Sequence, residues 1–299
     1  MSVISKRFKG VGLGLFLAAV LAAFLAATTA RVEAEELKRT AERLIPFAPG
    51  GEIHIDDENG RLFVEAWPRR EVSIQITRVV RAPSRSRAEE LMKELGAEVE
   101  VRDGQIRIEG HFPKRSESIG FLDLLRRKSI SFAINYYVRV PAQTDLDLDT
   151  ANGEVRVTGI SGRVQATTTN GDIRLEDVKG KVTLSTTNGE VRLDDLTGDA
   201  SASTTNGTVV ADVRNVMPQG RVMLQTTNGN VEAWFDKDLR ADLDATTTNG
   251  RVSIGFPITR HGVTSSRTIK GTIQGGGGKI VIATTNGDVV VRPRNTRGK

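Results

Sequence analysis

An Asn-Gly pair recurs along this chain at a nearly constant spacing, and it restricts the possible folds more than any other feature. The first three intervals between the asparagines are each 18 residues long, and the later intervals are 22, 21 and 37 residues. A short period repeated this often is typical of a repeat architecture. The asparagines are Asn152, Asn170, Asn188, Asn206, Asn228, Asn249 and Asn286.

Apolar residues occupy fixed positions around each asparagine. The residue three positions after Asn is Val or Ile in every copy, and the residue two further on is also apolar. The positions between them are mostly polar or charged, so the pattern alternates with a period of two and predicts strands with one buried face. The two apolar columns are Val155, Ile173, Val191, Val209, Val231, Val252 and Val289, and Val157, Leu175, Leu193, Ala211, Ala233, Ile254 and Val291.

The Asn-Gly pair can turn the chain in two ways. As a two-residue hairpin it would form a type I′ turn, in which both residues have positive φ, and an antiparallel β-meander would follow. As one corner of a coil it would produce a parallel β-solenoid with coils of 18 to 22 residues. Either way, we expect the glycine of the pair, such as Gly189, to need a positive φ.

Three observations favour the solenoid. Residues before a second set of glycines break the strand alternation, as a second corner would: these are Ile160, Val178 and Leu196, before Gly162, Gly180 and Gly198. Extra residues between Asn206 and Asn228 leave the flanking columns intact. Stacked coils would also place the asparagines about 4.8 Å apart, where their amides can form ladders. We therefore predict an all-β fold, a parallel β-solenoid, for residues 141–292.

The N-terminus has the features of an export signal. Lys6, Arg7 and Lys9 precede an apolar run, and the Val-Glu-Ala sequence ending at Ala34 offers a cleavage site. We predict a signal peptide over residues 1–34. The apolar run of about 17 residues is marginal for a membrane span, so an uncleaved anchor is the alternative. The chain has no cysteine, so the predicted exported fold must be stable without disulfides.

Residues 47–140 are predicted to form an N-terminal strand region with one short helix. The sequence Asp57–Gly60 resembles a degenerate first corner, and Ser86 and Glu89 have capping-box spacing that predicts a helix over residues 86–95. Strands 97–101 and 105–109 are joined by Asp103-Gly104, a hairpin signal. The helix and the segment 119–128 are expected to cover the N-terminal end of the stack, since an open edge would aggregate.

A strand over residues 132–141 is predicted to lead into the regular array. The 37-residue interval after Asn249 has the length of two coils with an unrecognisable corner between them. Residues 293–299 form a basic tail. Removing the predicted signal takes away four basic residues and one acid, so the net charge falls from +5 to +2. That is too little for a nucleic-acid-binding surface, and no nucleic-acid partner is expected.

The acidic strand Asp145, Asp147 and Asp149 is the first candidate for chemistry. Its carboxylates alternate along one face and lie about 6.5–7 Å apart, which is close to the spacing in inverting glycosidases. Any acidic strand has this spacing, and no aromatic sugar platform accompanies it. Arg163 is expected to stack beside Asp145. A carbohydrate-active β-helix enzyme is therefore the alternative, and the chain is predicted not to be an enzyme.

Outward columns of charge and of hydroxyl groups are the other candidates. Arginines beside acidic residues predict a cross-strand ion-pair lattice, with an anion-binding stripe as the alternative. Outward hydroxyl pairs are typical of strands, with ice binding as the alternative. The charged columns are Glu154, Asp172 and Glu190, and Arg156, Arg174 and Arg192; the hydroxyl pairs are Thr167 and Thr169, Ser185 and Thr187, Ser203 and Thr205, and Thr246 and Thr248.

The sequence offers no recognisable catalytic, cofactor or metal motif. His54, His111 and His261 are scattered without metal-ligand spacing. The glycine run 275–278 lacks the Lys-Ser/Thr of a phosphate-binding loop. We therefore assign no catalytic, cofactor-binding or metal-binding residue and expect no cofactor.

The repeated phrase itself resembles a known family. Recurrent Thr-Thr-Asn-Gly followed by an acidic residue and Val or Ile, and the closing GGGGKIVIATTNGDVVV, are similar to the bacterial "putative adhesin" β-strand-repeat family, over about Phe47–Arg292. The resemblance implies a β-solenoid from an envelope or surface-associated protein, without known catalytic residues. We expect an exported, non-enzymatic scaffold whose partner is an unknown envelope protein or glycan, and which contacts a membrane only through an uncleaved N-terminal segment.

Overall fold

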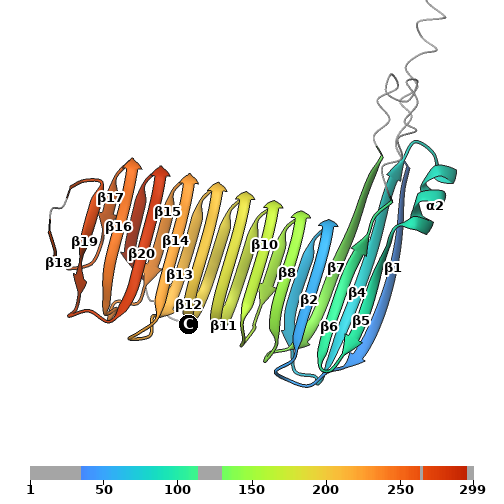
Figure 1. Cartoon of the computed structure of the whole chain (residues 1–299), viewed down its shortest axis with the longest axis horizontal. Helices are drawn as coiled ribbons and strands as arrows, with labels where there is room; N and C mark the ends of the chain where they lie inside the picture. The colour runs from blue at the N-terminus through green and yellow to red at the C-terminus, as the bar shows by residue number, and fades with distance from the viewer. Residues whose placement is uncertain (1–34, 114–129, 263–264, 295–299) are drawn as a thin grey trace, which may run out of the picture.

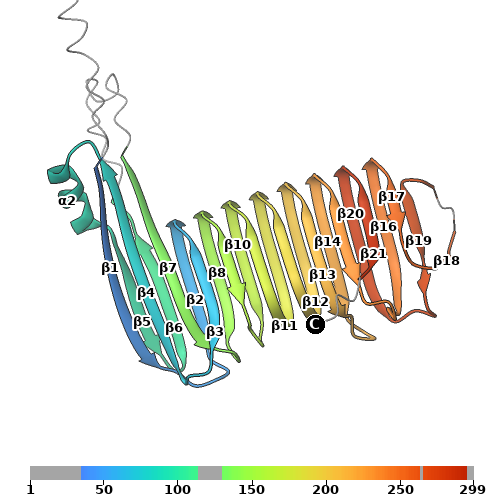
Figure 2. The same ribbon diagram turned by 180° about the vertical axis from the view of Figure 1, so that it is seen from behind.

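The computed structural model describes residues 35–113, 130–262 and 265–294. These residues form a single 21-stranded sheet that winds into a long stack, with one α-helix at the N-terminal end (Figures 1 and 2). The elements are β1 (Glu35–Pro46), β2 (Glu52–Asn59), β3 (Leu62–Trp67), β4 (Glu71–Ala82), α2 (Arg85–Glu94), β5 (Gly96–Arg102), β6 (Gln105–His111), β7 (Ser131–Pro141), β8 (Asp145–Asn152), β9 (Val155–Thr158), β10 (Val164–Asn170), β11 (Ile173–Asn188), β12 (Val191–Asn206), β13 (Val209–Asn215), β14 (Arg221–Asn228), β15 (Val231–Phe235), β16 (Ala241–Asn249), β17 (Val252–Ile254), β18 (Thr259–Arg260), β19 (Thr268–Ile273), β20 (Gly278–Asn286) and β21 (Val289–Pro293).

Successive coils of the repeat stack in parallel and in register. Ala166 on β10 lies between Leu148 on β8 and Leu184 on β11, and the corner asparagines of these strands are also register partners. After the corner, Ile173 lies between Val155 and Val191. The apolar columns form one continuous hydrophobic core, in which every member is buried except Ile254, which is partly buried against it. The predicted parallel β-solenoid is confirmed, and the antiparallel meander is excluded for the array.

The corner asparagines form the predicted amide ladder. From Asn170 onward, each Nδ2 donates a hydrogen bond of 2.8 Å to the Oδ1 of the asparagine on the neighbouring coil, as between Asn188 and Asn170, whereas the Asn152 Nδ2 donates to the Glu58 carbonyl. The other rungs join Asn170 to Asn152, Asn206 to Asn188, Asn228 to Asn206, Asn286 to Asn228 and Asn249 to Asn286. The predicted positive φ at Gly189 is wrong, because its backbone is not left-handed. Glycine is needed there for space, since a Cβ would collide with the carbonyl oxygen of Gly171.

In the coils around Gly189, a left-handed backbone occurs instead three residues before the second set of glycines, Gly162, Gly180 and Gly198. Gly159, Asp177 and Asp195 occupy equivalent places in successive coils, with φ of 77°, 50° and 69°. Asp is one of the few residues that tolerates this conformation. The residue that follows is buried in each case, as at Val178, which explains why the alternation breaks there.

The C-terminal end departs from the prediction of two further coils between Asn249 and Asn286. The chain instead turns back after β17, and β19 runs antiparallel to β16. β20 then inserts between β14 and β16 and runs parallel to both. The last corner in the sequence, Asn286, therefore lies between Asn228 and Asn249 in space. The antiparallel β19 covers an edge of β16 that a further coil would otherwise occupy.

The N-terminal end is closed mainly by antiparallel strands. β6 and β7 stack on β2 and β3, while β5 pairs with β6, and β4 and β1 extend from β7. The helix α2 packs on β1 and β4 through Ala88, Leu91 and Met92. Its N-cap is Ser84, which accepts a hydrogen bond from the Arg87 amide, so the predicted capping box at Ser86 is wrong.

Several predictions fall on residues outside the described ranges. They are the signal peptide or anchor over residues 1–34, the capping segment 119–128 and the tail residues 295–299. Within the described ranges, no helix has the length and apolar character needed to span a membrane. The degenerate corner at Asp57–Gly60 does lie within them and is confirmed, because Asn59 is the register partner of Asn152.

Candidate functional site

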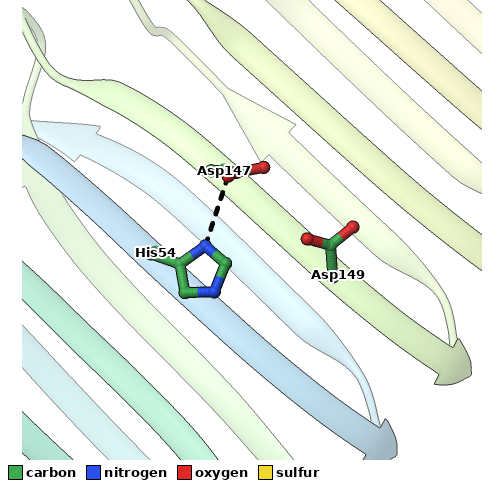
Figure 3. Close-up of side chains that lie close together, drawn as sticks. All are labelled: His54, Asp147 and Asp149. Carbon is green, nitrogen blue, oxygen red and sulfur yellow. Dashed lines mark hydrogen bonds and ion pairs between the residues drawn. The ribbon is translucent and has the colours of Figure 1, made fainter.

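Three side chains from two stacked coils converge on one outward face near the N-terminal end (Figure 3). His54 lies on β2 directly beside Asp147 on β8, and Asp149 follows two residues along the same strand. The His54 Nδ1 lies 3.3 Å from the Asp147 Oδ2. One ligand atom from each of the three residues lies within 4.8 Å of the other two. Among the described residues, this group has the geometry to hold a metal ion.

The cluster exists because the first coil departs from the repeat. In the next coil along, the register partner of Asp147 is Gln165, and that of Asp149 is Thr167. Further along the stack the two columns continue with Thr183 and Ser185. Only where β2 stacks on β8 do an imidazole and two carboxylates face one another in these columns. The sequence-based reasoning missed the cluster because His54 and Asp147 are 93 residues apart in the chain.

The local electrostatics leave this cluster rich in negative charge. Burial, and then the neighbouring Asp147 carboxylate, raises the pKa of Asp149, while a hydrogen bond from Thr167 opposes the shift. The Asp147 Oδ1 is buried and has no hydrogen-bond partner among the described residues. Asp56, the register partner of Asp149, adds a further carboxylate beside it.

The nearest basic side chains are engaged elsewhere. Arg107, the register partner of His54 on β6, pairs with Glu109 on its own strand. Arg163 pairs with Glu52 at 2.6 Å, and its Nε lies 3.8 Å from Asp145. The predicted stacking of Arg163 beside Asp145 is therefore present, and the backbone amide of Arg163 also donates to the Asp145 Oδ1 at 2.8 Å. Asp145 is thus set apart from Asp147 and Asp149.

The predicted arginine and acid columns lie on the face that follows the Asn-Gly corner. Arg174 is the register partner of both Arg156 and Arg192, so like charges do stack. The ion pairs, however, form between residues of the same coil: Arg156 pairs with Glu154 at 2.8 Å, and Arg192 pairs with Asp194 at 2.8 Å. The predicted cross-strand lattice is therefore wrong. Residues two apart on one strand face are close enough to satisfy the guanidinium without crossing to the next coil.

The predicted hydroxyl pairs point outward, while a third threonine of each copy points inward. Thr187 and Thr205 are exposed, and Ser185 and Ser203 are half-buried. The residue two positions before each Asn is a buried threonine, and from Thr168 onward its hydroxyl donates to a glycine carbonyl on an adjacent coil, whereas the Thr150 hydroxyl has no such partner. These bonds join Thr168 to Gly153, Thr186 to Gly171, Thr204 to Gly189, Thr226 to Gly207, Thr247 to Gly287 and Thr284 to Gly229, at 2.8–3.4 Å.

The first coil breaks this inner column with a carboxyl group. Asp57 takes the place of threonine beside Thr150 and is 3% exposed. It accepts hydrogen bonds of 3.1 Å from the Tyr136 hydroxyl and from the Asn59 amide. Burial raises its pKa to about 7, although both hydrogen bonds oppose the shift. This residue has no equivalent in the regular coils.

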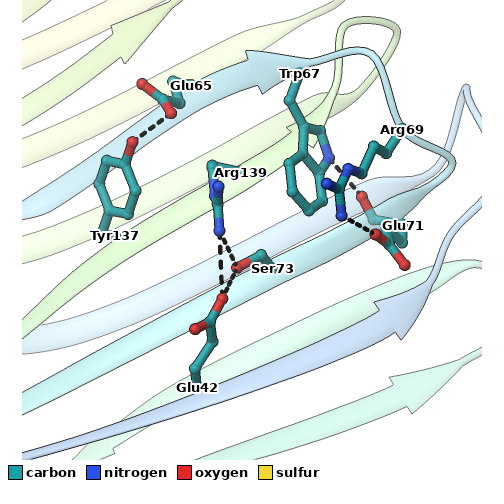
Figure 4. Close-up of polar contacts among 8 residues, drawn as sticks. All are labelled: Glu42, Glu65, Trp67, Arg69, Glu71, Ser73, Tyr137 and Arg139. Carbon is teal, nitrogen blue, oxygen red and sulfur yellow. Dashed lines mark hydrogen bonds and ion pairs between the residues drawn. The ribbon is translucent and has the colours of Figure 1, made fainter.

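A polar network on the N-terminal strands includes the aromatic side chains of Trp67 and Tyr137 (Figure 4). The guanidinium groups of Arg69 and Arg139 lie 5.0 and 4.6 Å from the ring centre of Trp67. Arg139 also contacts Ser73 at 3.2 Å and Glu42 at 3.3 Å. Two arginines thus lie over the indole ring that a sugar would need for stacking, which favours a structural role for the network.

The remaining histidines and the C-terminal arginine lie apart from this cluster. His111 is 3.7 Å from Glu98, and His261 contacts the Thr272 hydroxyl at 2.6 Å. Midway along the stack, beside β12, β13 and the end of β15, Arg294 lies against Asp195, Asp212 and Asp236, at 3.5, 2.9 and 3.7 Å. This arginine comes from the predicted basic tail and bridges carboxylates of three coils, so it serves to fasten the chain end.

Comparison with known proteins agrees with the repeat architecture. The model of the family described as Toastrack DUF4097 matches residues 47–292, which is nearly the range of the resemblance drawn from the repeated phrase. No curated protein shows a significant match to the chain.

Solved structures with similarity to the chain come from several bacteria. A putative adhesin from Bacteroides fragilis is 11% identical, with a TM-score of 0.39, and the match covers 86% of this chain and 97% of that one. A putative cell adhesion protein from Clostridium sporogenes is 12% identical, with a TM-score of 0.28 and coverage of 86% and 100%. A putative lipid binding protein from Parabacteroides distasonis is 12% identical, with a TM-score of 0.26 and coverage of 86% and 97%. At TM-scores this low, these structures inform neither the mechanism nor the partner of this chain.

Proposed function

The chain belongs to the Toastrack DUF4097 family, and from this premise we propose that it is an exported, non-enzymatic scaffold that presents a rigid, repetitive surface to an envelope protein or glycan. The observation that carries the proposal is the pair of hydrogen-bond ladders that fixes each coil to the next. The Asn188 amide and the Thr186 hydroxyl each bond to an adjacent coil, and both positions recur along the stack. Such nearest-neighbour bonding supports a stiff rod whose outward columns keep a constant spacing.

The outward surface has two faces with different chemistry. The face before the Asn-Gly corner carries hydroxyl columns through Thr167, Ser185 and Ser203, and the face after it carries the arginines with their acidic neighbours. Repeating groups of one kind suit a partner that is itself repetitive, because weak contacts then add along the length. An enzyme would need a group of residues that departs from these columns and acts on a substrate.

The export part of the proposal is tested by fractionating cells that produce the full chain. We expect the protein in the envelope or external fraction with Glu35 as its first residue, if the signal is cleaved after Ala34. A cytoplasmic product that begins at Met1 would contradict export.

The scaffold part is tested with variants that alter one face and leave the ladders intact. Thr167, Ser185 and Ser203 are replaced by lysine in one variant, and Arg156, Arg174 and Arg192 by serine in a second. Binding to isolated envelope fragments should fall sharply in one variant and remain in the other. Equal binding by both would contradict a face-specific scaffold.

The enzyme alternative is tested with a third variant, in which Asp145, Asp147 and Asp149 are replaced by Asn. If the native chain cleaves a polysaccharide and this variant does not, the chain is an enzyme and the scaffold proposal fails.

A further inference from the structure

We propose that His54, Asp147 and Asp149 form a binding site for a divalent transition-metal ion, with Zn²⁺ the best fit. This site goes beyond the scaffold role and does not depend on it. The donor atoms come from two different coils, so a bound ion would join β2 to β8 across the boundary between the N-terminal strands and the regular array.

The spacing of the donor atoms suits a small cation. Zn²⁺ binds imidazole nitrogen and carboxylate oxygen at about 2.0–2.2 Å, so two ligands of one tetrahedral ion lie about 3.5 Å apart. The His54 Nδ1 and Asp147 Oδ2 are already 3.3 Å apart. The Asp149 carboxylate has an oxygen within 4.8 Å of both, so it is placed to supply the third ligand.

The chemistry of the donors selects the class of ion. One neutral imidazole and two carboxylates are borderline ligands that suit Zn²⁺ better than Ca²⁺ or Mg²⁺, which prefer oxygen alone. Two carboxylates would neutralise the charge of the ion. A cation would also compensate the carboxylates, since the Asp147 Oδ1 is buried without a hydrogen bond and Arg107 and Arg163 are paired with glutamates.

The surroundings allow an ion to enter and keep open positions. The side chains of His54 and Asp147 are 24% and 31% exposed, so solvent and ions can reach the cluster. Three protein ligands leave at least one coordination position for water or for an oxygen donor of a partner. The backbone register of β2 and β8 holds the two strands in place, which reduces the reorganisation that binding requires.

The test is titration of the full chain, purified without a polyhistidine tag and treated with EDTA, with ZnCl₂ in a calorimeter. We expect one Zn²⁺ per chain, little heat with MgCl₂ or CaCl₂, and at least about a ten-fold weaker affinity in each of His54→Gln, Asp147→Asn and Asp149→Asn. Asp145→Asn, on the same strand face, and His261→Gln should bind as the native chain does. Thermal unfolding in EDTA checks that every variant is folded.

A second measurement reports on the site without relying on any substitution at its ligands. The chain has only three histidines, so their imidazole signals can be resolved by NMR and assigned with His111→Gln and His261→Gln. Zn²⁺ should shift the His54 signals and leave the other two unchanged. Absence of binding at micromolar Zn²⁺, an effect of Asp145→Asn equal to that of the ligand variants, or a shift centred on His111 or His261 would overturn the proposal.

Discussion

The central coils and the first coil share one backbone plan but differ in what their side chains do. In the central coils, asparagine and threonine at repeated positions bond to their equivalents or to glycine carbonyls on the next coil. The first coil keeps the corner, with Asn59 in register with Asn152, but places Asp57 where threonine stands elsewhere and His54 opposite Asp147. The comparison teaches that the repeated residues hold the coils together, whereas side chains that occur only once are found where the repeat ends.

Placing a charge in the central core should have the largest effect. Val191 is fully buried between Ile173 and Val209 in the stacked column. Val191→Asp would bury an unpaired carboxylate, and we expect a loss of about 4 kcal/mol or more in the free energy of unfolding. Chemical denaturation followed by circular dichroism would measure it. Thr183→Asp, at an exposed position of the neighbouring strand, is the matched control and should change stability little.

The buried carboxyl of the first coil should make stability depend on pH, unlike the threonines of the central coils. The pKa of Asp57 is raised from 3.8 to about 7, so the folded state holds a proton that the unfolded state has lost in this range. The contribution of Asp57 to the free energy of unfolding is fully present below about pH 4 and is lost as the pH rises through about 7. This loss amounts to at most about 4 kcal/mol. Asp57→Asn should remove this loss.

Denaturation midpoints of the native chain and Asp57→Asn, measured from pH 4 to pH 8, would check that expectation. The variant should gain relative stability as the pH rises, because an amide cannot ionise and can still accept the Asn59 amide hydrogen. Parallel curves would show that Asp57 is no more perturbed than an exposed aspartate.

Substituting a corner glycine tests whether close backbone contact between coils is the reason that glycine recurs in the Thr-Thr-Asn-Gly sequence. Gly189→Val would force a side chain against the Gly171 carbonyl, and we expect a loss of about 2 kcal/mol. Gly96→Ala, at a position where an added Cβ meets nothing within 4 Å and φ is not positive, is the control. Equal melting temperatures for the native chain and Gly189→Val would show that the coils can move apart at this corner.

Much of the array could be predicted because local residue patterns determine it. Period-two alternation and the Asn-Gly spacing give the strands, the corners and the parallel stacking. The order of the last coils could not be predicted in this way, because each coil presents the same Thr-Thr-Asn-Gly edge to its neighbours. β20 can therefore stack between β14 and β16 as well as beyond them. In the structure the chain reverses after β17, and again at the glycine turn before β20, where Gly275 has a φ of 81°.

The candidate metal site carried a signal that the sequence-based reasoning did not use. Once Asp57–Gly60 is taken as a corner, counting five residues back from Asn59 gives His54, and five back from Asn152 gives Asp147. Stacking then predicts that they are neighbours, as the register shows. The inward threonine was similarly within reach, since Thr186 shares the parity of the buried Leu184. The burial of Asp57 beneath Tyr136, in contrast, depends on β7, and no pattern links these two residues.

The smallest expected effect on stability concerns the buried threonines before each corner. A substitution there can test whether their hydrogen bonds stabilise the stack in addition to their burial. Thr186→Val keeps the shape of a buried side chain but removes the hydroxyl that donates to the Gly171 carbonyl at 3.0 Å. Loss of one such bond should lower the free energy of unfolding by about 1 kcal/mol. The matched control is Thr187→Val, one residue along and exposed, which should be neutral within about 0.5 kcal/mol.

Because the bond crosses between coils, Thr186→Val should also speed amide hydrogen exchange at the corners of β10 and β11 more than at β2, whose inner column holds Asp57. A uniform change along the stack, or a larger effect from Thr187→Val, would mean that the hydroxyl ladder does not hold the coils together.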